Sequence, residues 1–380
     1  MSKKIEKISL GSMSPGTERH LVAHRYGAKG ARPKAYLQAS IHADEIPAMM
    51  AAHHLIRILD EADRRGEIKG EIIVVPAANP IGLSQNINGV HPGRSELRGG
   101  GNFNRHWPDM FEGLVEAVEK KLGNDPDKNV AAIRAAMGEK LAKMRADAEF
   151  PRLRIELYRL AYDADYVLDM HCDDEALMHL YLTNDFWPAG ADLAADTGSR
   201  AAFLCDESGG QSFEEQFYLA FRKLRLHFGD KYPIPPTVLT CTLEYRGQSD
   251  VYDELGEADA RGLYRFLQRR GLIAGDPGKL PALLCEGTPL DGADYMRATV
   301  AGILAYKVKP GDSVKKGDLI AEIIDPLADD QANARTEMRA VTSGLVVSTC
   351  AKKLVAPGDG ITMIAGKEPL EHRKGPLLSD

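Results

Sequence analysis

Two histidines and a glutamate have the types and spacing of a catalytic metal site. His42 and Glu45 lie three residues apart, and His171 lies far downstream of them. Catalytic zinc is commonly held by three protein ligands of the histidine and carboxylate type, with a fourth position kept for water or substrate. The short spacer would form one rigid corner of the site, and the distant histidine would complete it when the chain folds. Such a ligand set also binds other divalent ions.

Glu244 supplies the further carboxylate that hydrolysis at such a centre needs. It lies near the end of the apolar run TVLTCTLEY (237–245). A general base takes a proton from the attacking water and passes it to the leaving amine. Arginines suit the remaining tasks, because a guanidinium can bind a substrate carboxylate or stabilise a developing oxyanion.

Each of these residues also has a purely structural explanation. Glu45 could cap the helix that follows it, His171 could be a hydrogen-bonded core histidine, and Glu244 could pair with Arg246. Their appearance at the ends of successive apolar runs favours the catalytic interpretation. The sequence has no HExxH, GxSxG or P-loop motif, so zincin, α/β-hydrolase and nucleotide-binding interpretations find no support.

The positioning elements are short apolar runs that alternate with longer amphipathic ones. This alternation predicts an α/β fold with a mostly parallel, mixed sheet covered by helices on both faces. Polar residues at the carboxyl ends of such strands meet at one edge of the sheet. The expected strands are 35–41, 71–78, 166–171, 201–205 and 237–245, and the expected helices are 47–62, parts of 111–147, 151–162, 189–199, 212–225 and 254–270.

Helical periodicity ends near residue 275, and short Val/Ile runs between Pro-Gly turns follow it. This change predicts two domains, 1–275 and 276–380. In the second, the segment 302–323 is echoed by 344–365, with Pro-Gly turns at matching places. This repeat predicts a small all-β barrel-sandwich domain, similar to biotinyl and lipoyl carrier domains. The stretch between the two halves contains no lysine, so a carrier role is not expected.

The composition is that of an ordinary soluble protein and limits the classes of partner. The net charge is −7 and the isoelectric point is about 5.9, which argues against nucleic acid or an anionic membrane as a partner. The first ten residues do not have the pattern of a signal peptide, and no apolar run is long enough to span a bilayer. The five cysteines are scattered, which predicts reduced thiols and a cytoplasmic location. The sequence leaves open whether the chain forms a homo-oligomer.

The order of the motifs resembles that of the succinylglutamate desuccinylase/aspartoacylase family, within the zinc carboxypeptidase-like superfamily. The resemblance rests on HxxE (42–45), NP (79–80), GRSELRGGGNFNRHWPD (93–109), DMH (169–171) and the strand-end Glu244. It covers about residues 35–270. A β-rich C-terminal domain also fits this family.

The resemblance implies a role for each candidate residue. One zinc ion per chain would be bound by His42, Glu45 and His171, with Glu244 as the general base and acid. Asn104 and Arg105 would bind the α-carboxylate of the substrate. Arg94 would polarise the scissile carbonyl, and Arg98 is the competitor for that role.

The function implied is hydrolysis of the amide bond in a small N-acylated amino acid or related carboxylate. One alternative is a metallocarboxypeptidase that acts on peptides, and a less favoured one is a binding module without catalysis. A C-terminal domain packed over the site would exclude long peptides and so favour the deacylase. Selectivity for the side chain is expected from loop residues such as 206–216 and from the C-terminal domain.

Overall fold

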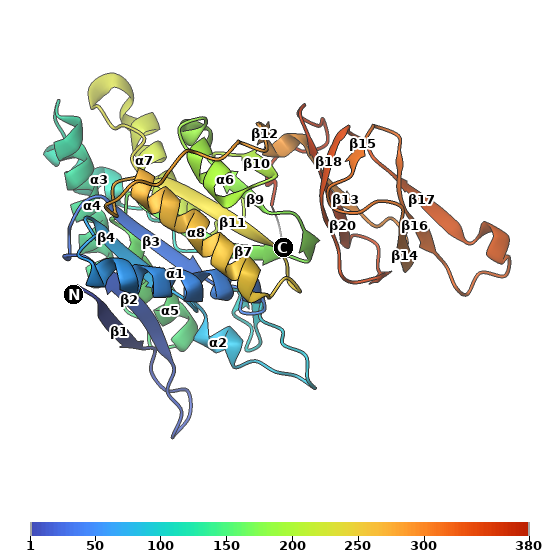
Figure 1. The fold of residues 1–380 in the computed structure, drawn as a ribbon, viewed down its shortest axis with the longest axis horizontal. Coiled ribbons are helices and arrows are strands. Elements are labelled where there is room, and N and C mark those ends of the chain that lie inside the picture. The colour runs from blue at the N-terminus through green and yellow to red at the C-terminus, as the bar shows by residue number, and fades with distance from the viewer. Residues whose placement is uncertain (1, 379–380) are drawn as a thin grey trace.

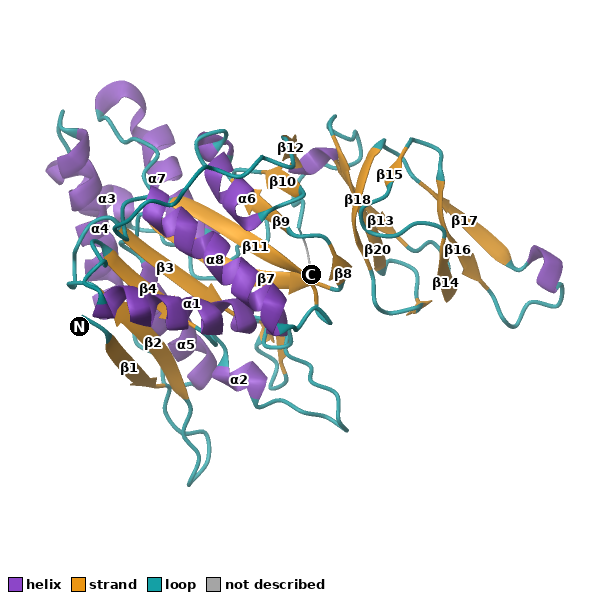
Figure 2. Cartoon of the chain, viewed as in Figure 1, coloured by secondary structure: helices purple, strands orange, loops and turns teal. Residues whose placement is uncertain are grey.

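The computed structural model describes residues 2–378 and is built around a nine-stranded mixed sheet (Figures 1 and 2). The strand order is β1-β2-β4-β3-β7-β11-β9-β10-β12. The four strands β4, β3, β7 and β11 run parallel to one another in the middle of this sheet. The strands are β1 (Lys4–Ser9), β2 (His20–Tyr26), β3 (Lys34–Ala39), β4 (Glu71–Val75), β7 (Tyr166–Asp173), β9 (His179–Leu182), β10 (Ala201–Leu204), β11 (Leu239–Gly247) and β12 (Gly287–Pro289).

Helices cover both faces of the sheet and enclose two hydrophobic cores. One face is packed by α1, α6 and α8, and α1 and α8 lie side by side across it in Figure 1. The other face is packed by α3, α4, α5 and α7. The helices are α1 (Ile46–Arg64), α2 (Pro80–Leu83), α3 (Leu114–Val118), α4 (Pro126–Lys143), α5 (Glu149–Ala161), α6 (Ala191–Thr197), α7 (Glu215–Phe228) and α8 (Asp253–Arg269).

Alternation along the central strands separates apolar and polar side chains onto opposite faces. In β7, Leu168 and Met170 pack into the core beneath α1 and α8. Asp169 and His171 therefore point to the other face, where the loops of the site lie. In the register of the sheet, Asp169 is opposite Thr242 of β11, and His171 is opposite Glu244. The strand pattern thus brings one polar row to the carboxyl end of the parallel strands.

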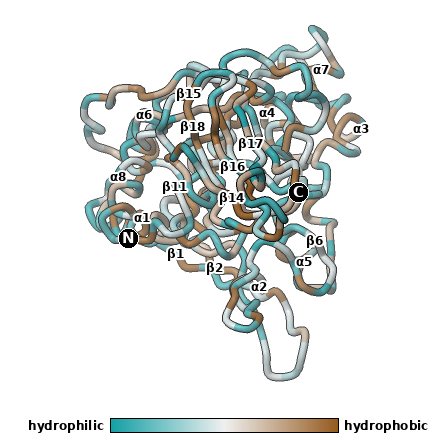
Figure 3. Tube along the Cα trace, turned by 90° about the vertical axis from the view of Figure 1, so that its right-hand side faces the viewer, coloured by the Kyte–Doolittle hydropathy of each residue, from teal (hydrophilic) through white to brown (hydrophobic). Residues whose placement is uncertain are grey.

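The chain after β12 forms most of two further sheets, here called the C-terminal β segment (residues 293–366). Each repeat predicted from the sequence forms a long, a short and a long strand, and each short strand pairs with the first long strand of the other repeat. Figure 3 views the molecule from the side of this segment. The strands are β13 (Ala293–Arg297), β14 (Gly302–Tyr306), β15 (Ser313–Val314), β16 (Leu319–Ile324), β17 (Arg335–Arg339), β18 (Gly344–Thr349), β19 (Leu354–Val355) and β20 (Gly360–Gly366).

The C-terminal β segment is joined to the nine-stranded sheet by backbone pairing and apolar packing. Strand β8 (Glu175–Ala176), directly after β7, pairs antiparallel with β18. Phe203 of β10 packs with Val347 and Met363 in a small shared core. Both parts of the chain therefore contribute to the surface near the end of β7.

The predicted mixed sheet with flanking helices is confirmed. Of its eight strand pairings, five are parallel and three antiparallel. The boundary at residue 275 and the likeness of the second domain to biotinyl and lipoyl carriers stay predictions. Among the described residues, no helix has both the length and the apolar composition needed to cross a bilayer.

Candidate active site

A tight turn between β3 and α1 carries the first two predicted metal ligands. The turn begins at Ser40, whose φ of 57° lies in the left-handed region. The Ser40 hydroxyl donates a hydrogen bond of 2.7 Å to the backbone carbonyl of Glu45 and so closes the turn. Gly93 packs against this turn so closely that an added Cβ would lie 2.1 Å from the backbone nitrogen of Asp44. A strained and tightly packed loop of this kind is typical of functional sites.

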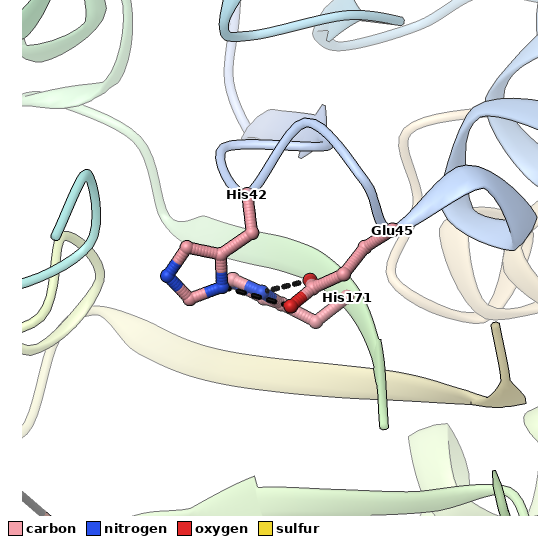
Figure 4. A group of neighbouring side chains, drawn as sticks. All are labelled: His42, Glu45 and His171. Carbon is pink, nitrogen blue, oxygen red and sulfur yellow. Dashed lines mark hydrogen bonds and ion pairs between the residues drawn. The ribbon is translucent and has the colours of Figure 1, made fainter. Parts of the chain in front are cut away.

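The structure brings His42, Glu45 and His171 together in one buried group. Nδ1 of His42 lies 2.8 Å from Oε1 of Glu45, and Nδ1 of His171 lies 2.6 Å from Oε2 of the same carboxylate. Figure 4 shows both imidazole rings facing Glu45. Their potential ligand atoms lie within 4.8 Å of one another. Residues from a loop and from the neighbouring strand β7 thus form a single His-Glu-His cluster.

The opposite ring nitrogens of both histidines are held by buried acceptors. Nε2 of His42 lies 2.9 Å from Oδ1 of Asn102, and Nε2 of His171 lies 3.0 Å from Oδ2 of Asp169. These contacts fix the rings and place a proton on Nε2, so that Nδ1 can serve as a ligand. Histidines that bind metals usually donate their other ring N–H in this way. The donor set and its surroundings therefore fit a zinc ion.

The charges in this cluster favour a bound cation. Burial acts to lower the pKa of His171, but the negative charges of Asp169 and Glu45 outweigh it and hold the pKa well above its usual value. Burial acts to raise the pKa of Glu45, but the two histidines outweigh it and lower the pKa. The buried carboxylates thus require positive charge close by, which a divalent ion would supply in place of protons.

Glu244 lies on β11 next to the His-Glu-His cluster, and one of its oxygens, Oε2, is buried without a hydrogen-bond partner in residues 2–378. Burial raises its pKa to about 8, and the carboxylate of Glu45 adds to that effect. Arg246 does not pair with it, because a bulge in β11 follows Glu244 and Arg246 binds both oxygens of Asp259, at 2.9 and 2.5 Å. The structure therefore gives no support to a structural ion pair for Glu244.

The remaining predicted residues differ in where they lie. Arg94, Asn104 and Arg105 line the same cavity as the cluster, whereas Arg98 lies in an exposed turn outside the cavity lining. Nη1 of Arg94 lies 3.6 Å from Oε1 of Glu45. Nδ2 of Asn104 donates to Asp169 over 3.2 Å, and its Oδ1 accepts from the backbone N–H of Phe213 over 3.0 Å. Asn104 therefore also links the cavity wall to β7.

The cavity has a volume of about 170 Å³ and includes residues that the motifs did not reveal. Outside the cavity lining, Asp169 belongs to the DMH motif, and the alternation in LDMHCD places it on the same face as His171. No motif marks the contributions of the C-terminal β segment and the chain after it. The additional lining residues include Asp173, Tyr181, Thr183, Ser208, Ser212, Glu214, Glu215, Thr242, Leu290, Tyr295, Arg297, Leu377 and Leu378.

Comparisons with known proteins agree on a relationship over most of the chain. A deacetylase from Halomonas elongata, named N-alpha-acetyl-L-2,4-diaminobutyric acid deacetylase, is 24% identical over 350 residues, which is 89% of this chain and 83% of that protein. A solved structure of a succinylglutamate desuccinylase/aspartoacylase family protein from Shewanella amazonensis has a TM-score of 0.83 at 24% identity. The match covers 96% of this chain and 99% of that one. The product-bound ectoine utilization protein EutE (DoeB) from Ruegeria pomeroyi has a TM-score of 0.66 at 18% identity and covers 96% and 94% of the two chains.

The family model for the succinylglutamate desuccinylase/aspartoacylase catalytic domain matches residues 31–270. This range contains the His-Glu-His cluster, Glu244 and the cavity-lining arginines Arg94 and Arg105. The chain therefore belongs to the succinylglutamate desuccinylase/aspartoacylase family.

Proposed function

We propose that this protein is a zinc-dependent hydrolase that removes the acyl group from a small N-acylated amino acid. One observation carries the proposal: the His-Glu-His cluster and the unpaired Glu244 carboxylate line the same small cavity. Zinc held by His42, Glu45 and His171 would act as a Lewis acid that acidifies water and polarises the scissile carbonyl.

Glu244 acts as the proton carrier. Its Oε2 has no partner among the described residues, so it is able to accept a proton from the attacking water. The same carboxyl group then donates the proton to the departing nitrogen. A pKa raised by burial suits this double task, because a general base works best when its pKa lies near the working pH.

The arginines of the cavity hold the charged ends of the substrate. Arg105 and Asn104 bind the α-carboxylate, and Arg94 donates to the carbonyl oxygen as negative charge develops on it. Arg94 is favoured over Arg98 for this role because Arg94 lies beside Glu45 and lines the cavity. Asp169 and Asn102 hold the two histidine rings in place.

The size of the cavity favours a small substrate over a peptide. Its volume of about 170 Å³ is only slightly larger than the roughly 150 Å³ engineered cavity that binds benzene. Tyr295 and Arg297 of the C-terminal β segment form part of its wall. A wall at this position leaves little room for a polypeptide chain, which argues against the metallocarboxypeptidase alternative.

The test is a substrate screen on the zinc-loaded and the chelator-treated protein. The screen compares N-acetyl, N-succinyl and N-formyl amino acids, including the Nα-acetyl-L-2,4-diaminobutyrate named for the Halomonas relative, with blocked di- and tripeptides. We expect zinc-dependent release of a free amino acid from at least one acyl amino acid and little cleavage of peptides. Preferred cleavage of peptides would overturn the proposal, as would full activity after removal of the metal.

A further inference from the structure

Two adjacent glutamates at the start of α7 form an acidic part of the cavity wall, away from the His-Glu-His cluster. Glu214 is only 7% exposed. Its Oε1 accepts hydrogen bonds from the hydroxyls of Ser212, at 2.8 Å, and Thr242, at 2.7 Å. Oε1 of Glu215 accepts from the backbone N–H of Ser208 over 2.6 Å. The second oxygen of each carboxylate is buried and has no hydrogen-bond partner among the described residues.

This acidic wall lies directly beside the residues proposed to bind the α-carboxylate. The backbone N–H of Phe213, the residue before Glu214, donates to Oδ1 of Asn104 over 3.0 Å. The N–H of Trp107 donates to the carbonyl of Gln211 over 3.1 Å. The loop before α7 therefore runs alongside the Asn104–Arg105 segment. A substrate whose carboxylate is held by Arg105 would extend its side chain along the neighbouring wall.

Within residues 2–378, neither carboxylate of the wall forms an ion pair, and each has one buried oxygen without a hydrogen-bond donor. Burying an ionised carboxylate is costly unless a cation or several donors pair with it. Burial raises the pKa of Glu214 to about 7, and the charges of Asp169 and Glu215 add to the effect. The buried hydroxyl of Thr183, which also lines the cavity, likewise has no hydrogen-bond partner in the described part of the chain. A primary ammonium carries one positive charge and three N–H donors, which matches these unpaired acceptors.

We infer that Glu214, together with Glu215, binds the side-chain ammonium of the substrate, so that the enzyme prefers N-acylated amino acids with a basic side chain. This inference rests on the proposed function. Glu214 is the main contact because it is the more deeply buried of the two, and Glu215 supplies a second carboxylate at the same wall. Neither residue takes part in the proton transfer assigned to Glu244.

The first test compares a matched pair of substrates, Nα-acetyl-L-2,4-diaminobutyrate and Nα-acetyl-L-2-aminobutyrate, which differ by one amino group. We expect the wild-type enzyme to have a kcat/KM at least tenfold higher for the cationic substrate. Glu214→Gln keeps the hydrogen bonds to Ser212 and Thr242 but removes the charge. It should lower kcat/KM for the cationic substrate at least tenfold, mainly through KM, and change that for the neutral one little.

Glu207→Gln is the matched control, because it removes the same charge from an exposed glutamate of the same loop. It should leave the preference unchanged, which separates direct contact from long-range attraction. Equal kcat/KM values of the wild type for the two substrates would overturn the inference. So would an equal loss on both substrates in a folded Glu214→Gln protein.

A second measurement does not depend on turnover. Calorimetric titration of the zinc-loaded protein with L-2,4-diaminobutyrate and L-2-aminobutyrate should show at least tenfold tighter binding of the diamine, lost in Glu214→Gln. If this selectivity is found and no acyl amino acid is hydrolysed, the proposed function fails and the cationic subsite stands. If neutral acyl amino acids are the better substrates, the proposed function stands and the subsite fails. Uptake of a second zinc ion that Glu214→Gln abolishes would also overturn the inference, because the wall would then bind metal.

Discussion

Oδ2 of Asp169 lies 3.0 Å from Nε2 of His171, on the side of the ring opposite the nitrogen that faces Glu45. Asp169 is fully buried and also accepts hydrogen bonds from Gln38, at 2.9 Å, and Asn104, at 3.2 Å. One carboxylate therefore connects a proposed metal ligand, a proposed substrate-binding residue and the neighbouring strand β3. A change at Asp169 should affect metal binding although this residue does not itself belong to the His-Glu-His cluster.

Asp169→Asn is expected to weaken zinc binding by about ten- to a hundredfold, because an amide is a poorer acceptor for the His171 ring N–H. Competition with a chelator, followed by zinc analysis, measures this change. Asp329→Asn, at an exposed position of the C-terminal β segment, is the control and should bind zinc like the wild type. Unchanged zinc affinity in Asp169→Asn would show that Asp169 does not position His171.

His42→Ala and His171→Ala should each abolish both zinc binding and activity, because each removes one of three ligands. The exposed His53 offers the control, since His53→Ala removes an imidazole outside the site. Metal content of the purified proteins, measured together with circular dichroism, decides the outcome. Full zinc occupancy in folded His171→Ala would remove that residue from the ligand set.

Alanine variants of the three arginines should differ in which kinetic parameter, KM or kcat, they change. Arg105→Ala should mainly raise KM through loss of the carboxylate contact, and Arg94→Ala should mainly lower kcat through loss of transition-state stabilisation. Arg98→Ala should stay close to the wild type, because Arg98 lies in an exposed turn outside the cavity lining. Steady-state kinetics on the best substrate tests all three. A loss of kcat in Arg98→Ala, with Arg94→Ala unaffected, would reverse the assignment of the two residues.

Glu244→Gln should retain zinc and lose about a hundredfold or more in kcat, as expected for loss of a general acid and base. Its melting temperature should not fall, because the carboxylate has one unpaired buried oxygen and is not bound to Arg246. Zinc content, melting temperature and kcat are measured on the same preparation. A near-normal kcat with zinc retained would contradict the catalytic role.

Glu214 should make stability depend on pH in the absence of substrate. Its pKa is raised by burial to about 7 in the folded protein, compared with about 4.3 in an unfolded chain. The folded state thus holds a proton that the unfolded state releases, so stability falls as pH rises from about 4.3 to about 7. The loss is on the order of 3 kcal/mol and should be absent from Glu214→Gln.

Urea unfolding at pH 5 and pH 8 measures this effect as the difference in unfolding free energy between the wild type and Glu214→Gln. The unfolding free energy of Glu214→Gln should exceed that of the wild type by a larger margin at pH 8 than at pH 5. Glu207→Gln should show no such growth, because that side chain is exposed. A difference that is the same at both pH values would show that Glu214 is ionised throughout this range.

Much of the α/β core could be predicted from the sequence, because buried parallel strands are continuous apolar runs. The five expected strands correspond to β3, β4, β7, β10 and β11, and the expected helices correspond to α1 and α3 to α8. Strands β1 and β9 escaped prediction for different reasons. Strand β1, at one edge of the sheet, has the sequence KIEKIS and no fully buried residue, so its apolar pattern is weak. Strand β9 lies inside the sheet and is largely buried, but it spans only four residues, too few to form a clear apolar run.

The residues of the site likewise include some that the sequence predicts and others that only the fold reveals. His42, Glu45, His171 and Glu244 could be proposed because each lies at or just beyond the end of an apolar run. The contact of Asn102 with His42 depends on how the loop 93–109 folds against the turn before α1, which no local pattern reveals. The loop 206–216 could be expected to affect selectivity, but the burial of Glu214 follows from its packing against Thr242 of β11.

The cavity wall formed by Tyr295 and Arg297 bears on when the metal binds during synthesis of the chain on the ribosome. All the proposed zinc ligands, and Glu244 with them, are synthesised before residue 245, whereas Tyr295 and Arg297 emerge later. Because the parts of a protein generally fold in the order of their synthesis, the nascent chain can assemble its zinc ligands while the cavity still lacks this wall. We expect the metal to bind more readily at that stage than in the finished enzyme, in which this wall is in place.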